Sequence, residues 1–140
     1  MVELLANVII PKALKEFHAF FPNATAKFYL DGEGRGVIKI LDGEYLIGLE
    51  FIETETSWSS KKRMWEYYVA LVNKCRLVVY VPQPHAMPAR MRMLEFNQHW
   101  LNYYLVYSYD SSLAIEKIGR PRVLPHTPLR AGAMPLGGYL

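Results

Sequence analysis

The pair Asp42-Gly43 constrains the fold of this chain more than any other feature of its sequence. It lies between two segments with the composition of strands, RGVIKIL at 35–41 and YLIGLEFI at 45–52. Asp-Gly between such segments is a strong signal for a tight β-hairpin, because glycine adopts the positive φ that the turn requires. AKFYL at 26–30 adds a strand before them, after which the chain passes through a glycine-rich turn. We therefore predict that the three segments form an antiparallel meander.

The rest of the chain alternates between helical and strand periodicity. Apolar residues from Met64 to Val72 recur every three or four positions, which indicates a helix, with serines before it as caps. The run RLVVYV at 76–81 is typical of a strand buried on both faces. The remaining expected elements are a helix that Pro11 opens and that ends before Pro22, a helix from Pro88 to about Trp100, a strand over 101–109, and one or two helical turns in 111–118. This order predicts an α/β fold, with a mixed central sheet and flanking helices on both faces.

Composition and charge divide the chain of 140 residues into two parts. With 51% hydrophobic and 21% charged residues, it has the composition of a globular protein, and we expect a single domain over residues 1–118. Residues 119–140 hold four prolines, four glycines, three arginines and no acid. Since the other 13 basic residues balance the 13 acids, the excess charge lies in this Pro/Gly-rich basic tail, which we expect to form no core of its own.

Several classes of protein are not expected. No apolar run approaches the roughly 20 residues that cross a bilayer, so the sequence predicts no membrane partner. The N-terminus MVELLANVII lacks a basic leader, and the single cysteine, Cys75, suits a reducing compartment. We therefore expect a cytoplasmic protein.

Acidic residues point to a possible site, because seven of the 13 acids lie between residues 31 and 55. Glu50 stands among apolar neighbours late in its strand, and Asp31 ends the first strand of the meander. If Glu50 is at an edge, it simply faces water. If it is buried, it needs a partner, since an unpaired buried charge is costly. Acids at the ends of two strands can converge on a divalent cation.

These residues and the order of elements resemble the restriction-endonuclease-like superfamily, the PD-(D/E)XK nucleases, whose core is αβββαβ. Leu30-Asp31-Gly32 is similar to the first motif, and Leu49-Glu50-Phe51-Ile52, with its acid 19 residues on, to the second. The resemblance implies a cofactor, Mg²⁺ or Mn²⁺, held by Asp31, Glu50 and a third carboxylate, Glu53 or Glu33. The ion would activate water against a DNA phosphodiester bond.

The motif's lysine is absent, because Ile52 occupies its place. Lys61 or Lys62, early in the following helix, would then act in its stead, so the expected catalytic residues are Asp31, Glu50, Lys61 and Lys62. The residues expected to bind nucleic acid are Arg35, Lys61, Lys62, Arg63, Arg120 and Arg122. The sequence thus predicts a small metal-dependent nuclease acting on DNA. The alternative is an inactive DNA-binding or oligomeric interaction protein on the same fold, for example a homodimer whose tail contacts the neighbouring subunit.

Overall fold

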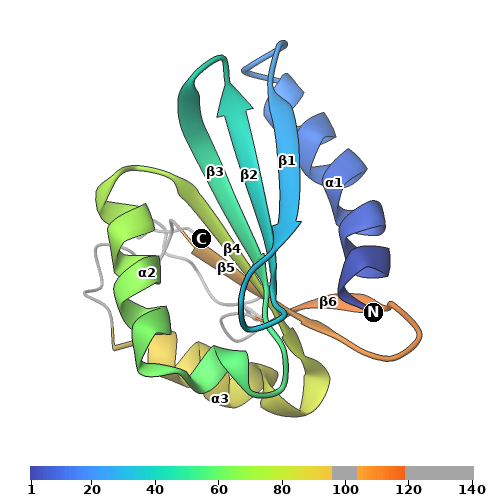
Figure 1. Cartoon of the computed structure of the whole chain (residues 1–140), viewed down its shortest axis with the longest axis vertical. Helices are drawn as coiled ribbons and strands as arrows, with labels where there is room; N and C mark the ends of the chain where they lie inside the picture. The colour runs from blue at the N-terminus through green and yellow to red at the C-terminus, as the bar shows by residue number, and fades with distance from the viewer. Residues whose placement is uncertain (96–103, 119–140) are drawn as a thin grey trace, which may run out of the picture.

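The computed structural model describes residues 1–95 and 104–118, which form three α-helices, one short 3-10 helix and a six-stranded sheet (Figure 1). The helices and strands, in chain order, are α1 (Val2–His18), β1 (Thr25–Leu30), β2 (Gly36–Asp42), β3 (Tyr45–Ile52), η1 (Ser57–Ser59), α2 (Lys61–Val72), β4 (Arg76–Pro82), α3 (Gln83–Met93), β5 (Tyr104–Tyr109) and β6 (Ile115–Ile118). No helix among these residues has the length and apolar composition to cross a membrane.

The sheet is mixed, and its strands lie side by side in chain order. Strands β1, β2 and β3 form the antiparallel meander that the sequence predicts, with Gly43 at φ 65° in the turn between β2 and β3. Strands β3, β4 and β5 pair in parallel, and β6 returns antiparallel to β5. The predicted α/β class with a mixed sheet is therefore confirmed.

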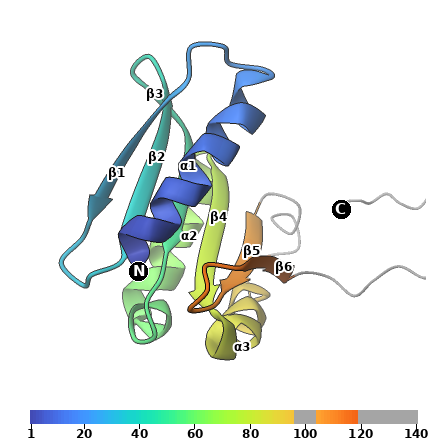
Figure 2. The ribbon, with the colours of Figure 1, turned by 90° about the vertical axis from the view of Figure 1, so that its right-hand side faces the viewer.

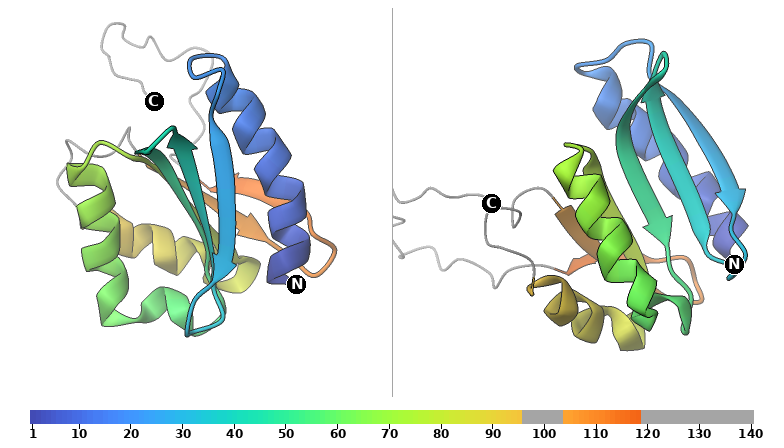
Figure 3. Two further views of the ribbon diagram at one scale, coloured as in Figure 1. Left: turned by 45° about the horizontal axis from the view of Figure 1, so that its top comes forward. Right: turned by 60° about the vertical axis from the view of Figure 1, so that its left-hand side comes forward.

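Helices cover both faces of the sheet. Figure 2 shows α1 across one face, and Figure 3 shows α2 and α3 on the other. On the α1 face, Leu5, Ile9 and Phe17 pack against Ile38, Ile40, Ile52 and Val78. On the α2 face, Tyr67, Leu71 and Met93 pack against Val37, Phe51, Leu77 and Val79. Each face therefore has its own apolar core.

Alternation along β3 assigns its residues to the two faces. Leu49 and Phe51 pack in the core under α2, whereas Ile52 packs in the core under α1. Since side chains alternate along a strand, Glu50 lies on the α1 face with Ile52. Glu53, directly after the strand, continues the Phe51 side and contacts Tyr67 of α2. The two acids thus lie on opposite sides of the sheet.

Helix α1 begins at Val2, not at Pro11 as the sequence predicts. Pro11 lies within the helix and cannot donate the usual bond to the carbonyl of Asn7. The helix continues because its buried face continues, with Leu5 and Ala13 packed on the sheet on either side of the proline. Tertiary burial here outweighs the cost of one lost hydrogen bond.

The prediction for α3 was wrong in the same way, because Pro88 lies inside the helix and does not start it. The helix begins at Gln83, directly after β4, with Pro84 in the first turn, where no N–H bond is lost. It ends at Met93 rather than near Trp100. Of the predicted strand over 101–109, the structure describes Tyr104–Tyr109 as β5.

Residues 115–118 form strand β6 and not the helical turns expected there. The carboxylate of Asp110 accepts bonds from the backbone N–H groups of Ser112 and Ala114, at 2.9 and 3.1 Å. Leu113 adopts a positive φ of 67° in the same turn. This tight turn reverses the chain, so that Ile115 pairs with Tyr109.

Candidate functional site: a carboxylate–arginine cluster

Four acids and two arginines gather where β1 and β3 end and α2 begins. We call them the carboxylate–arginine cluster: Asp31, Glu33, Arg35, Glu53, Arg63 and Glu66. The turn after β1 supplies Asp31 and Glu33, and the chain enters β2 at Arg35. Glu53 follows β3, and α2 supplies the other two members. Segments far apart in sequence therefore meet at one end of the sheet.

The guanidinium of Arg35 binds three carboxylates at once. Its Nε donates to Asp31 Oδ2 at 2.6 Å, its Nη1 to Glu53 Oε2 at 2.7 Å and its Nη2 to Glu66 Oε1 at 2.6 Å. The group also lies over the Phe51 ring, 4.4 Å from the centroid, and only 2% of the residue is exposed. Burial alone would lower the pKa of Arg35, but the surrounding carboxylates raise it above its ordinary value. Arg35 is therefore a permanent internal cation.

The Glu53 carboxylate is fully buried and has partners at both oxygens. Ser57 Oγ donates to Oε1 at 2.6 Å, while Arg35 Nη1 and the Tyr67 hydroxyl donate to Oε2. The backbone is held as well, since the Tyr109 hydroxyl donates to the Glu53 carbonyl at 2.6 Å. Burial and the nearby carboxylates raise the pKa of Tyr109 to about 12, so this donor keeps its proton at neutral pH.

The second buried arginine, Arg63, completes the cluster. Its Nη2 donates to Glu33 Oε2 at 2.7 Å, and its Nη1 lies 2.9 Å from Glu66 Oε1. Lys62 adds a third cation at the solvent side, 3.9 Å from Glu33. Each acid of the cluster therefore contacts an arginine.

Asp31 is positioned by its own turn. Its Oδ1 accepts bonds from the backbone N–H groups of Glu33, at 2.8 Å, and Arg35, at 3.2 Å. Burial alone would raise the pKa of Asp31, but the hydrogen bond from the Arg35 side chain and these backbone bonds lower it overall. The carboxylate is thus ionised at neutral pH and already paired.

This arrangement does not fit Mg²⁺ or Mn²⁺. Divalent ions of this kind need several oxygen ligands that are free to coordinate. Both oxygens of Glu53 already accept hydrogen bonds, and the Arg35 guanidinium bridges Glu53 to Asp31 where a shared ion would have to lie. Within residues 1–95 and 104–118, no group of three or more His, Cys, Asp or Glu side chains is placed to hold a metal ion.

The structure corrects the predicted pairing of Asp31 with Glu50. Glu50 lies on the α1 face, where it accepts a hydrogen bond from Tyr80 at 2.9 Å, whereas Asp31 lies in the cluster under α2. The sheet separates the two carboxylates, so they cannot share an ion. The acid that joins Asp31 is Glu53, which the sequence proposed only as a third ligand.

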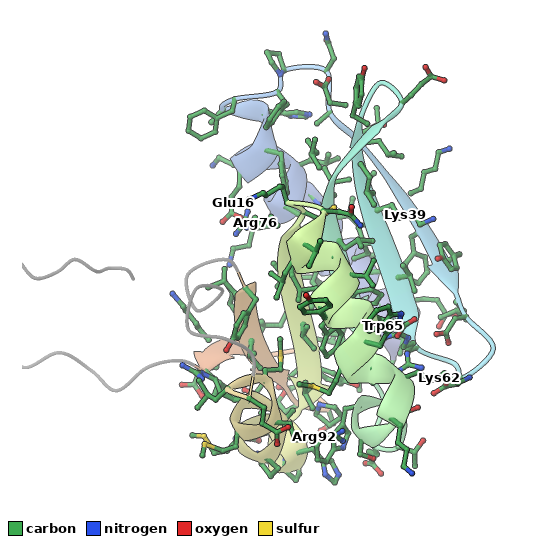
Figure 4. The ribbon with its side chains drawn as sticks, turned by 90° about the vertical axis from the view of Figure 1, so that its left-hand side faces the viewer. Glu16, Lys39, Lys62, Trp65, Arg76 and Arg92 are labelled. Carbon is green, nitrogen blue, oxygen red and sulfur yellow. The ribbon has the colours of Figure 1, made fainter. Side chains whose placement is uncertain are left out.

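The other predicted site residues fall into three groups. Arg35 and Arg63 were expected to bind nucleic acid, but both are 2% exposed and bind carboxylates. Lys61 and Lys62 lie exposed in the first turn of α2, and Figure 4 shows Lys62 on the same side of the molecule as Lys39 and Trp65. The remaining two, Arg120 and Arg122, lie outside the described residues.

Sequence reasoning missed the roles of Ser57, Glu66 and Tyr67 in this cluster. Glu66 of α2 binds both Arg35 and Arg63. One signal was available in the sequence, because Arg63 lies on the same helical face as Tyr67 and Ala70, four and seven residues further on. An arginine on such an apolar face is expected to be buried and therefore to need acidic partners.

Comparison of the chain with protein-family models, with curated proteins and with solved structures finds no significant match.

Proposed function

We propose that this protein binds DNA on a restriction-endonuclease-like core and does not hydrolyse it. The order α1–β1–β2–β3–α2–β4, with β3 and β4 parallel, supports the choice of core. The convergence of Asp31 and Glu53 at one end of the sheet supports it too, since two strand-end acids meet there.

The observation that carries the proposal is the position of Arg35. Its guanidinium bridges Asp31 and Glu53, so a permanent cation neutralises the carboxylates that a nuclease of this kind would use for a metal. Removing a buried arginine from its partners costs several kcal/mol, because an uncompensated charge is left behind. The cluster is therefore built to hold α2 against the meander rather than to take up an ion.

The DNA would lie on the α2 side of β1 and β2. In this register Lys27 is directly opposite Lys39, and both share the sheet face of Val37. Like charges directly opposite one another are unfavourable, so an anionic partner is favoured there. Exposed Lys62 of α2, which Figure 4 shows on this side, adds a further cation, and exposed Lys61 precedes it in the same turn of the helix. We call these four residues the lysine face.

Exposed aromatic rings accompany the lysines. Trp65 and Tyr68 of α2 are 68% and 41% exposed, and their ring centroids lie 5.8 Å apart. Tyr29 of β1 is exposed beside Lys39, whose Nζ lies 5.5 Å from the ring centroid. Lysines interspersed with open aromatic rings suit phosphate contacts combined with stacking or sugar packing. Such a face favours nucleic acid over an acidic protein.

A second candidate is the metal-dependent nuclease that the sequence predicts. The observation in its favour is again that Asp31 and Glu53 come together at one end of the sheet. This candidate requires the Arg35 guanidinium to leave its place between them.

Binding and cleavage of labelled duplex DNA by the full chain separate the two candidates. We expect anisotropy to show binding in EDTA as well as in Mg²⁺, with no cleavage products in either buffer. Lys27→Gln combined with Lys39→Gln should flatten the slope of log K against log salt by about two units, since each phosphate contact contributes about 0.9.

The matched control neutralises two lysines elsewhere, Lys15 on α1 and Lys117 on β6, which are both exposed. It should leave the slope as in the wild type. Equal slopes for all three proteins would refute the lysine face. Cleavage in Mg²⁺ or Mn²⁺ that is lost in Asp31→Asn would establish the nuclease instead.

A further inference from the structure

A cavity of about 180 Å³ opens on the α1 face of the sheet, away from the carboxylate–arginine cluster. Its floor is formed by β3, β4 and β5, its walls by α1 and by the turn before β6. The polar residues that line it are Lys12, Glu16, Glu50, Arg76, Tyr80 and Tyr107. The volume is about six times the share of one water molecule in the liquid, so the cavity has room for a small organic molecule.

Glu50 is the buried charge of this cavity. The residue is 2% exposed, and its Oε1 accepts the hydrogen bond from Tyr80. No other hydrogen bond or ion pair involving Glu50 is found among the described residues, and the residue lines the cavity. A carboxylate in such a buried residue with a single hydrogen-bond donor is costly, and this cost favours a ligand that brings a second donor.

The surroundings of Glu50 are apolar or aromatic. Ile9, Ala13 and Val78 supply aliphatic surface, while the rings of Tyr80 and Tyr107 are stacked with centroids 5.2 Å apart. Such walls cover hydrocarbon well and offer aromatic faces to a cation. They provide few oxygens, so a bare metal ion is a poor fit.

Charged residues form the rim. Arg76 of β4 and Glu16 of α1 form an ion pair of 3.0 Å, and the labels in Figure 4 show them side by side. Lys12, one turn before Glu16, is exposed. Glu16 therefore has Arg76 as its ion-pair partner, whereas no ion pair joins Glu50 to Arg76 or Lys12, although both cations act on Glu50 at longer range.

We propose that this cavity binds a small molecule with a primary ammonium group on a short apolar chain, and that Glu50 is its counter-ion. The ammonium would donate to Oε2, and the chain would lie against the aliphatic walls and tyrosine rings. A simple amine and an amino acid share this chemistry. The second would add a carboxylate near Lys12 and Arg76. This inference is independent of the proposed DNA binding, which concerns the opposite face.

The test is a calorimetric titration of the full chain with n-butylammonium, with 4-aminobutyrate and with butyrate. We expect n-butylammonium to bind saturably and butyrate not to bind. Tighter binding of 4-aminobutyrate than of n-butylammonium would assign the site to amino acids, and weaker binding to simple amines. Glu50→Gln should weaken n-butylammonium binding at least about tenfold, because it removes a charge-assisted hydrogen bond in a buried site.

The matched control is Glu44→Gln, which removes an exposed carboxylate from the β2–β3 turn and should leave the affinity unchanged. A second measurement needs no variant: backbone amide shifts of the wild type on addition of n-butylammonium. Shifts confined to cavity residues such as Ile9, Ala13 and Val78 support the site. Absence of binding, equal affinity in Glu50→Gln, or shifts only around the carboxylate–arginine cluster would overturn it.

Discussion

The side chain of Arg35 illustrates how one residue type decides what a site can do. Its three nitrogens reach three carboxylates in a fixed planar geometry, while its face packs on Phe51. A lysine offers a single ammonium and could not span Asp31, Glu53 and Glu66 in this way. Such a buried network contributes little net stability compared with an apolar core, yet it is costly to break. It therefore fixes the position of α2 more than it stabilises the fold.

Glu50 shows the opposite case, a buried carboxylate with one hydrogen-bond donor. Burial raises the pKa of Glu50 above its ordinary value of 4.5, and the Tyr80 hydrogen bond and the charges of Arg76 and Lys12 offset this only in part. A carboxyl with a raised pKa in the folded state binds its proton more tightly there than in the unfolded chain. Its contribution to stability is therefore fully present at low pH and is lost as pH rises through the unfolded pKa toward the folded one.

We expect Glu50→Gln to be more stable than the wild type at neutral pH, because the amide has no charge to desolvate and still accepts the Tyr80 bond. The difference should shrink as pH falls below the ordinary glutamate value. Urea unfolding of both proteins at about pH 4 and about pH 7 measures it. Glu44→Gln, which alters an exposed side chain, should follow the wild type at both pH values. A wild type more stable than Glu50→Gln at neutral pH would contradict the argument.

At the scale of elements, Gly48 of β3 allows α1 to lie close to the sheet. A Cβ added to Gly48 of β3 would lie 2.6 Å from Phe17 Cζ and 3.3 Å from Ile40 Cβ. Phe17 is 8% exposed and is held in the core, so it has little room to move. The bare backbone of Gly48 thus lets the last turn of α1 approach the sheet closely.

Gly48→Ala should therefore lower the free energy of unfolding by about 1–3 kcal/mol, the usual cost of overpacking a core. The matched control is Gly32→Ala, where an added Cβ meets nothing within 4 Å and φ is not positive. Chemical denaturation of the two variants and the wild type gives both values. A neutral Gly48→Ala would show that α1 can shift away from β3 without loss of packing.

Element prediction succeeded where local chemistry and tertiary packing agree. The Asp42-Gly43 hairpin, strand β3 over 45–52 and the apolar face of α2 carry their signals within a few residues. It failed at Pro11 and Pro88, because a proline is a boundary signal only when no buried face continues past it. Helices α1 and α3 both have such a face, and neither its depth nor its partner strands can be known from a local window.

In the whole molecule, the sheet separates two sites: the carboxylate–arginine cluster on the α2 face and the cavity on the α1 face. The sequence shows that Glu50 and Ile52 share a face, and its acidic stretch at 31–55 contains three of the four acids of the cluster, all except Glu66. It does not show on which face Asp31 falls, because that depends on the turn through Arg35 and on where α2 crosses the sheet. The acids at the strand ends therefore indicated the region of the site. Which two acids meet there, Asp31 and Glu53, is determined by long-range packing.

Charge is also distributed at the scale of the whole molecule. Residues 119–140 lie outside the described part of the chain, but their sequence holds three arginines and no acid, so the net charge of +3 arises there. If this tail assists DNA binding, neutralising Arg120, Arg122 and Arg130 to glutamine should flatten the salt slope by at most about three units. The midpoint of unfolding should stay unchanged, since the six strands and the core residues described above do not include these arginines.

A salt titration of the triple glutamine variant against labelled duplex DNA measures this, with light scattering on the same samples. The competing account is that the apolar tail residues Val123 and Leu124 dock on a neighbouring subunit. In that case the salt slope stays at its wild-type value, and Val123→Ser with Leu124→Ser lowers the molecular mass instead. Because one account acts through charge and the other through apolar area, only the first responds to salt. A triple variant with an unchanged slope would therefore remove the tail from the proposed DNA contacts and leave them to the lysine face.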